Sequence, residues 1–284
     1  MPELHTLLTD LALGESPRWH RGRLWLCDWG ANEILAVDPA GKREVIATIP
    51  SVPFCIDWLP DGRLLVVSGG ESRLLCREPD GSFVTYADLT GLSTYPWNEI
   101  VVDGRGNAYV NTIGFDFPDG EFAPGIIALV TPEGAVREVA DGVAFPNGMV
   151  VTPDNATLIL AESYGNRLTA FDITADGSLA NRRTWADLDG DYPDGICLDA
   201  AGAIWCADVP NQRCVRVREG GEVLQTVALD RGCFACMLGG VDNRTLFMVA
   251  AAWSGAESMA DGQRTGVVLS TEAPAPGAGW PSHG

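Results

Sequence analysis

The chain has 284 residues, of which 46% are hydrophobic and 20% charged, so it can bury a large apolar core. Its 38 acidic and 19 basic residues give a formal net charge of −19, which repels phosphate backbones and anionic membrane surfaces. We therefore expect neither nucleic acid nor a membrane as a partner.

The first fifteen residues contain no basic segment followed by a long apolar run, so the sequence predicts neither a signal peptide nor a transmembrane span. The eight cysteines are scattered, mostly inside apolar runs, as is typical of free buried thiols. Cys233 and Cys236 have the CxxC spacing, but no second pair follows at the spacing of a zinc ribbon. We expect structural cysteines in a reducing cytoplasm, and the sequence leaves the oligomeric state open.

Along the chain, six segments share one pattern: a short anchor, an apolar strand, a tight turn and a second strand. The segments span residues 14–29, 53–68, 96–111, 146–163, 193–208 and 234–251. Their anchor residues are 40 to 49 positions apart. A repeat of this length with several strands per unit is typical of the blades of a β-propeller.

The second half of each unit also predicts strand, tight turn and strand, because Asp-Gly, Glu-Gly and Ala-Gly pairs join short alternating apolar runs. The sequence thus predicts an all-β, six-bladed β-propeller with four-stranded blades. The sixth unit lacks a final strand of its own, and we expect the N-terminal segment 4–10 to supply it and close the ring. One domain is predicted over residues 1–271, followed by a flexible tail rich in Pro, Ala and Gly at 272–284.

The anchors are the positions most informative about function, because the innermost strands of a propeller face its central channel and equivalent positions converge there. The six anchors are Glu15, Cys55, Asn98, Asn147, Asp194 and Cys236. Four of them carry oxygen ligands that hard cations prefer, and carboxylates crowded on one axis repel unless a cation or protons compensate. Any single anchor could instead be a turn or cap residue. The matched positions favour a metal site, whereas only three histidines disfavour a catalytic triad or a His-rich zinc site.

From Leu13 to Ser270 the sequence resembles the senescence marker protein, gluconolactonase and luciferin-regenerating enzyme superfamily. The matching motifs are GESPRW at 14–19, PNG at 146–148, PDGICLDAAGAIWCA at 193–207, and CMLGG with DNRTLF within 236–247. The resemblance implies a six-bladed propeller that holds one divalent cation through Glu15, Asn147 and Asp194. It also implies that Asp194 is the general base.

The resemblance implies a substrate contact at Asn98, which lies in the family's Arg-x-Asn-Asp segment. This chain has Pro96 in place of the Arg and Glu99 in place of the Asp, so it keeps the amide and loses the guanidinium. We therefore expect a preference for lactones that are less polar than aldonolactones. Asp116 lies where some members place an acidic substrate contact.

Three aromatic residues are further candidates for substrate binding. Trp97, beside Pro96, is predicted to present a flat apolar face. Trp29 and Tyr164 follow second strands of their blades and could add aromatic surface at the same end of the channel. The alternative is that these rings only pack between blades.

The implied reaction is metal-dependent hydrolysis of a lactone, in which the cation polarises the carbonyl and Asp194 takes a proton from water. Oxygen ligands favour Ca²⁺ first, then Mg²⁺ or Mn²⁺, and Fe²⁺ and Zn²⁺ also accept them. Two alternatives remain open at this point. One is phosphotriester hydrolysis on the same site, as in the related diisopropylfluorophosphatase, and the other is a non-catalytic metal-containing propeller that binds a small molecule.

Overall fold

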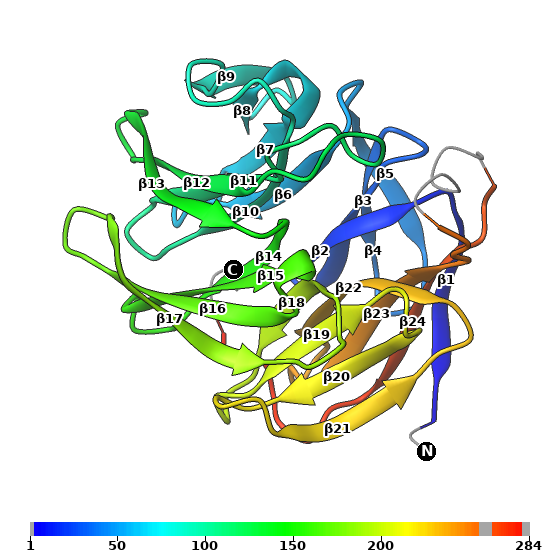
Figure 1. Cartoon of the computed structure of the whole chain (residues 1–284). Coiled ribbons are helices and arrows are strands. Elements are labelled where there is room, and N and C mark those ends of the chain that lie inside the picture. The colour runs from blue at the N-terminus through cyan, green and yellow to red at the C-terminus, as the bar shows by residue number, and fades with distance from the viewer. Residues whose placement is uncertain (1–2, 256–262, 280–284) are drawn as a thin grey trace.

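The structure is a computed structural model that describes residues 3–255 and 263–279. Within these ranges the chain forms six four-stranded antiparallel sheets arranged in a ring, so the predicted six-bladed propeller is confirmed (Figure 1). Two single-turn 3₁₀ helices, η1 (Gly69–Glu71) and η2 (Ser163–Gly165), follow second strands. Among the described residues, no helix has the length and apolar character needed to cross a membrane.

The strands of each blade run from the axis outward, and the first strand is always the innermost. Blades one to three consist of β2 (Gly14–His20), β3 (Arg23–Asp28), β4 (Glu33–Val37) and β5 (Arg43–Thr48); β6 (Phe54–Trp58), β7 (Leu64–Ser68), β8 (Arg73–Arg77) and β9 (Phe83–Asp88); and β10 (Trp97–Val102), β11 (Ala108–Thr112), β12 (Gly125–Val130) and β13 (Val136–Val143). Blades four to six consist of β14 (Pro146–Val151), β15 (Thr157–Glu162), β16 (Arg167–Ile173) and β17 (Leu179–Asp187); β18 (Pro193–Leu198), β19 (Ile204–Asp208), β20 (Arg213–Val217) and β21 (Val223–Ala228); and β22 (Gly232–Gly239), β23 (Thr245–Ala251), β24 (Gly266–Glu272) and β1 (His5–Leu11).

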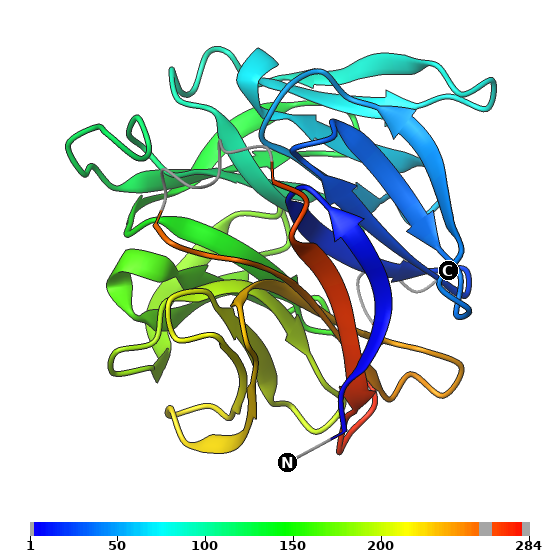
Figure 2. The ribbon, with the colours of Figure 1, turned by 90° about the vertical axis from the view of Figure 1, so that its right-hand side faces the viewer.

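The N-terminal strand closes the ring, as the sequence predicts. Strand β1 is the outermost strand of blade six and pairs antiparallel with β24, with His5 opposite Ser270 and Thr6 opposite Leu269. Figure 2 shows β1, in dark blue, lying along the red strand β24. The two ends of the chain therefore share one sheet, which leaves no incomplete blade.

The turns between first and second strands share one geometry in blades two to six, with glycine or asparagine at positive φ. In blade two, Gly62 has φ +86° and its amide donates to the Leu59 carbonyl at 2.8 Å. In blade four, Asn155 has φ +57° and its amide donates to Thr152 at 2.8 Å. Glycine and asparagine tolerate this left-handed conformation best, which explains why the repeat keeps these residue types at its turns.

The apolar core is a ring of clusters, most of them formed between two neighbouring blades. Blades two and three enclose Trp97, and blades five and six enclose Trp205, and both rings are fully buried. All eight cysteines are buried and free, in agreement with the predicted structural thiols. Because each blade buries both of its faces against neighbours, its inner strands read as nearly continuous apolar runs.

The described part of the C-terminal segment lies against the ring. The Ala273 amide donates to Arg244 at 2.7 Å, and the Ala278 amide donates to Leu198 at 3.0 Å. Gly277 forms an isolated bridge with Asp199. Backbone hydrogen bonds thus hold residues 273–278 on blades five and six, while the flexibility predicted for 272–284 stays a prediction and residues 280–284 lie outside the described ranges.

Candidate metal and substrate site

The strand register identifies which side chains stand at one level around the axis. In every blade, the first residue of the innermost strand pairs with the last residue of the second strand, for example Pro146 with Glu162 and Pro193 with Asp208. The residues that come next along the six innermost strands are Glu15, Cys55, Asn98, Asn147, Asp194 and Cys233.

The sixth of these residues corrects the sequence analysis, which chose Cys236. Strand β22 pairs Gly232 with Ala251, so Cys233 and not Cys236 stands at the anchor level. Cys236 lies farther along the strand, with its sulfur 3.8 Å from that of Cys197 in blade five. The CxxC spacing hid this shift because both cysteines lie in the same apolar run.

The glycines of the PNG and PDG motifs allow neighbouring blades to approach closely at the anchor level. A Cβ atom on Gly148 would lie 2.6 Å from the Ile196 amide nitrogen, and one on Gly195 would lie 2.5 Å from the Ala235 side chain. Both glycines lie inside innermost strands at register irregularities, not in turns. Such bulges re-aim the adjacent side chains, which places Asn147 and Asp194 where the blades meet.

The structure brings the three predicted metal ligands together. Glu15 is buried, and its pKa is raised by burial, by Asp194 and by Glu99. The pKa of Asp194 is also raised by burial and by Glu99, although a hydrogen bond from the Asn147 side chain opposes the shift. Asn147 and Asp194 are partly exposed, so a small ligand can reach them.

A hydrogen-bond chain fixes Asn147 relative to the next blade. The Asn111 amide donates to the Asn147 carbonyl at 2.8 Å, and the Asn147 amide lies 3.4 Å from the Ser163 hydroxyl. That hydroxyl donates to the Pro193 carbonyl at 2.7 Å, one residue before Asp194. The ligand positions of blades four and five are therefore coupled through Ser163, which the sequence analysis did not single out.

A buried ion network lies beside these ligands, and the sequence analysis missed it. Arg18 donates to the Glu99 carboxylate at 3.2 Å and to the Ile100 carbonyl at 2.7 Å, and its Nε is 4.0 Å from Asp57. Burial would lower the pKa of Arg18, but Glu99 and Asp57 raise it. One clue was available: Arg18 follows Glu15 on the same strand, inside the GESPRW motif.

The charges at this end of the axis do not balance. Four carboxylates, those of Glu15, Asp57, Glu99 and Asp194, have one guanidinium among them. Among the described residues no ion pair reaches Glu15 or Asp194, and the hydrogen bond to the Glu15 carboxylate, from the Ser16 amide, is 3.3 Å long. The carboxylates of Glu15 and Asp194 and the side-chain amide of Asn147 supply oxygen ligands, and no cationic side chain among the described residues neutralises the two acids. This donor set fits a hard divalent cation.

The Asn147 amide is the third member of the predicted ligand set. In residues 3–255 and 263–279, no group of three or more His, Cys, Asp or Glu side chains is arranged to hold a metal ion. The set of Glu15, Asn147 and Asp194 contains only two such residues. The amide of Asn147 is therefore an essential part of the predicted site.

The predicted substrate residues fall into two groups. Asn98 is at the anchor level, and its amide lies 3.4 Å from the Pro146 carbonyl, at the edge of hydrogen bonding. Trp97 is fully buried between blades two and three, so its ring exposes no face to a ligand. Trp29 is partly buried, donates from its indole to the Phe54 carbonyl at 2.6 Å and packs against the clusters around it. The contacts of Trp29 are thus packing contacts, which agrees with the alternative that this ring only packs between blades.

The other two predicted residues lie farther from the axis at the same end of the ring. Asp116 is exposed in the connection between β11 and β12, and its carbonyl accepts the Gly120 amide at 2.5 Å. Tyr164 lies in η2 with 47% of its surface exposed, and its ring is 4.6 Å from that of Phe145.

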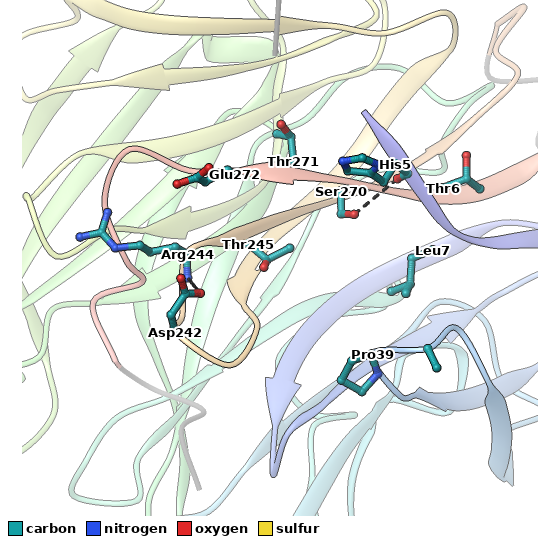
Figure 3. Close-up of a pocket in the computed structure, with 11 residues that line it drawn as sticks. His5, Thr6, Leu7, Pro39, Asp242, Arg244, Thr245, Ser270, Thr271 and Glu272 are labelled. Atoms are coloured by element: carbon teal, nitrogen blue, oxygen red, sulfur yellow. Dashed lines mark hydrogen bonds between the residues drawn. The ribbon is translucent and has the colours of Figure 1, made fainter. Parts of the chain in front are cut away.

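A separate cavity of about 480 Å³ lies between the outer strands of blade six and the β4–β5 turn. Figure 3 shows His5 and Ser270 on one side of it and Asp242 with Arg244 on another. Asp242 belongs to the β22–β23 turn, at the opposite end of the innermost strand from the anchors. This cavity is therefore remote from the candidate site.

The family model for the SMP-30/gluconolactonase/LRE-like region matches residues 13–252. The chain belongs to this family. A relative in Pseudomonas putida, 6-deoxy-6-sulfogluconolactonase, is 26% identical over 95% of this chain and 94% of its own length. The pentonolactonase XacC of Haloferax volcanii is 24% identical over 77% of this chain and 81% of its own length.

The family's fold matches as well. The solved structure of a calcium-binding protein, regucalcin, from Agrobacterium tumefaciens superposes with a TM-score of 0.82 at 20% identity, covering 99% of this chain and 97% of that one. The similarity confirms the six-bladed propeller for this chain.

Proposed function

We propose that this protein is a metal-dependent lactonase, with Glu15, Asn147 and Asp194 holding one divalent cation and Asp194 acting as the general base. The observation that carries the proposal is the pair of unneutralised carboxylates of buried Glu15 and partly exposed Asp194, with the Asn147 amide hydrogen-bonded to Asp194. Membership of a family that includes named lactonases supports the reaction class. The calcium-binding structural relative supports Ca²⁺ as the first ion to test, before Mg²⁺, Mn²⁺, Fe²⁺ and Zn²⁺.

When bound, the cation would polarise the lactone carbonyl and stabilise the negative charge that develops on its oxygen. Asp194 takes one proton from the attacking water as the water oxygen bonds to the carbonyl carbon. The bond between that carbon and the ring oxygen then breaks, and the ring oxygen leaves as an alcohol with the proton from Asp194. Burial and Glu99 raise the pKa of Asp194, and a carboxylate with a raised pKa is a stronger base than an exposed aspartate.

Neighbouring groups orient the substrate and keep the charges in place. Asn98 is proposed to donate its amide to a substrate oxygen in exchange for the long contact with the Pro146 carbonyl. Arg18 holds Glu99 through a 3.2 Å bond, which keeps that carboxylate from competing for the cation. The free thiols fit a reducing compartment, so we propose a cytoplasmic location.

The test is a panel of lactones assayed by acid release, using protein stripped of metal and then supplied with one divalent ion at a time. We expect turnover only with a restored ion, and loss of turnover in Asp194→Ala. Asp172→Asn serves as the matched control, because Asp172 is half-exposed and forms a surface pair with Arg183 at 2.6 Å. Full activity of the chelated protein would contradict the proposal.

The same experiment separates the alternatives. Turnover of phosphotriesters with no turnover of lactones would favour a phosphotriesterase-like enzyme on this site. Metal binding by calorimetry with no turnover of either class would favour a binding protein.

A further inference from the structure

Blade three carries an extended connection at the end of the ring where the candidate site lies. Four other blades join their second and third strands with four residues, at 29–32, 69–72, 163–166 and 209–212. Blade three uses residues 113–124 between β11 and β12. Because second strands end where innermost strands begin, this additional chain lies at the same end as Asn98.

The extended connection contributes three phenylalanine rings that pack with two rings outside it. Phe115 contacts Phe122 edge to face with centroids 5.7 Å apart. Tyr164, in blade four, lies 5.8 Å from Phe122 and 4.6 Å from Phe145. We call the five rings the aromatic wall: Phe115, Phe117, Phe122, Phe145 and Tyr164.

The aromatic wall is tied to the predicted metal ligand of blade four. Phe145 precedes the PNG motif by one residue and has φ +56°, a conformation that strains a bulky residue and needs support from its surroundings. Its carbonyl accepts the Ser163 amide at 3.0 Å. Ser163 contacts Asn147 through its hydroxyl and is followed directly by Tyr164. Short links therefore fix the wall relative to Asn147.

The wall has a buried base and an exposed face. Phe115 is 3% exposed, whereas Phe122 and Tyr164 are 49% and 47% exposed. A cluster formed only for stability would be expected to bury its largest rings. The same connection has no basic residue and three exposed acids, which are Asp116, Asp119 and Glu121. Its charge opposes anionic substituents and tolerates neutral ones.

We infer that the exposed face of the aromatic wall binds a neutral aryl or extended alkyl substituent of the substrate, with Phe122 and Tyr164 as specificity-determining residues. The inference rests on the proposed lactonase function and names the class of lactone. The substituent stacks on the two rings while the lactone carbonyl lies toward Asn147. Aromatic rings favour offset or edge-to-face contacts with such groups, and loss of one ring removes both contact area and stacking.

The test compares kcat/KM for γ-butyrolactone and γ-phenyl-γ-butyrolactone in the wild type, Phe122→Ala, Tyr164→Ala and the double variant. We expect the wild type to prefer the phenyl lactone, each single variant to lose about tenfold on it, and the double variant to lose about 50-fold. Activity on γ-butyrolactone should fall much less than activity on the phenyl lactone, because that substrate has no substituent to contact the wall, and circular dichroism checks that the variants fold. Tyr164→Phe should keep the preference because it keeps the ring.

Leu224→Ala is the matched control, since Leu224 is an exposed apolar residue, 39% exposed, on the outer strand of blade five. It should leave both rates unchanged. An unchanged preference for the phenyl lactone in the double variant, or no preference in the wild type, would overturn the inference and leave the lactonase standing.

A binding measurement separates this inference from the hydrolysis itself. Calorimetric titration with 5-phenyl-2-pyrrolidinone, a neutral lactam that resists hydrolysis, should show binding by the wild type and at least tenfold weaker binding by the double variant. That result without turnover of any lactone would support the wall and refute the lactonase. Equal lactam affinity in the two proteins would overturn the inference that the aromatic wall binds the substituent.

Discussion

The Glu162 carboxylate and the two carboxylates of the candidate site lie in opposite electrostatic environments. Glu162, at the end of β15, accepts hydrogen bonds from Arg167, Arg182, the Thr169 hydroxyl and the Ala144 amide. Burial would raise the pKa of Glu162, but these donors lower it below its ordinary value. At the candidate site, burial and neighbouring carboxylates raise the pKa values of Glu15 and Asp194.

The difference indicates what each group is for. A buried acid whose partners all come from its own chain holds the structure together, as Glu162 holds the start of blade four through Ala144. Buried acids that the chain leaves without a cation cost free energy in the empty protein, unless protons or an external cation neutralise them. The comparison therefore predicts that the two groups respond oppositely to mutation and to metal.

The largest expected effect is on catalysis at Asp194. Asp194→Ala should lower kcat/KM by about 10³-fold, because it removes both a proposed ligand and the proposed base. The free energy of unfolding of the metal-free protein should not fall, since the change removes a carboxylate repelled by its neighbours. Steady-state kinetics and urea unfolding of the chelated protein check both parts. A large loss of stability would show that Asp194 is structural, like Glu162.

The converse effect is expected at Glu162. Glu162→Gln should cost about 3 kcal/mol of unfolding free energy, because it leaves the Arg167 and Arg182 guanidinium groups without their shared partner. Since the folded-state pKa of Glu162 is lowered, its stabilisation is present above the unfolded pKa and is lost as pH falls through the folded pKa. The deficit of the variant should therefore shrink in acid. Metal affinity, measured by calorimetry, should stay unchanged.

Metal addition should stabilise the protein through the candidate site alone. At a free Ca²⁺ concentration 100 times the Kd, the wild type should gain about 2.7 kcal/mol of unfolding free energy. Glu15→Gln should lose most of that gain, because the amide carries no charge to attract the cation. Glu162→Gln should keep it, although its starting stability is lower. An equal gain in all three proteins would place the ion elsewhere.

The smallest effect concerns His20, whose Nδ1 is buried with no hydrogen-bond partner among the described residues. His20 stacks on Trp58 with centroids 4.1 Å apart, and burial, assisted by Arg21, lowers its pKa to about 4. The unfolded chain therefore binds a proton that the folded protein does not, so stability should fall by about 1 kcal/mol between pH 7 and pH 5.5. His20→Phe should remove this part of the acid sensitivity, measured as the difference between two urea titrations. An identical pH dependence in the variant would contradict the assignment.

The sequence by itself determined the repeat, the four-stranded blades and closure by the N-terminal strand, because turn residues and apolar alternation recur at a fixed period. Matched positions in a closed ring converge on its axis, which made Glu15, Asn98, Asn147 and Asp194 candidates, and the family resemblance then implied three of them as metal ligands. These conclusions depend on the residue types at repeated positions along the chain, which can be read from the sequence alone.

Tertiary structure decided what depends on contacts between distant segments. The register of β22 shows that the sixth anchor is Cys233, because the pairing of a strand depends on its partner strand as well as on its own sequence. Inter-blade packing buried Trp97, which the sequence placed at the substrate. The bond from Arg18 to Glu99 joins residues 81 positions apart, and the aromatic wall joins a connection of blade three to Tyr164 in blade four. No local sequence pattern predicts such long-range contacts, because they form only when the blades pack into the ring.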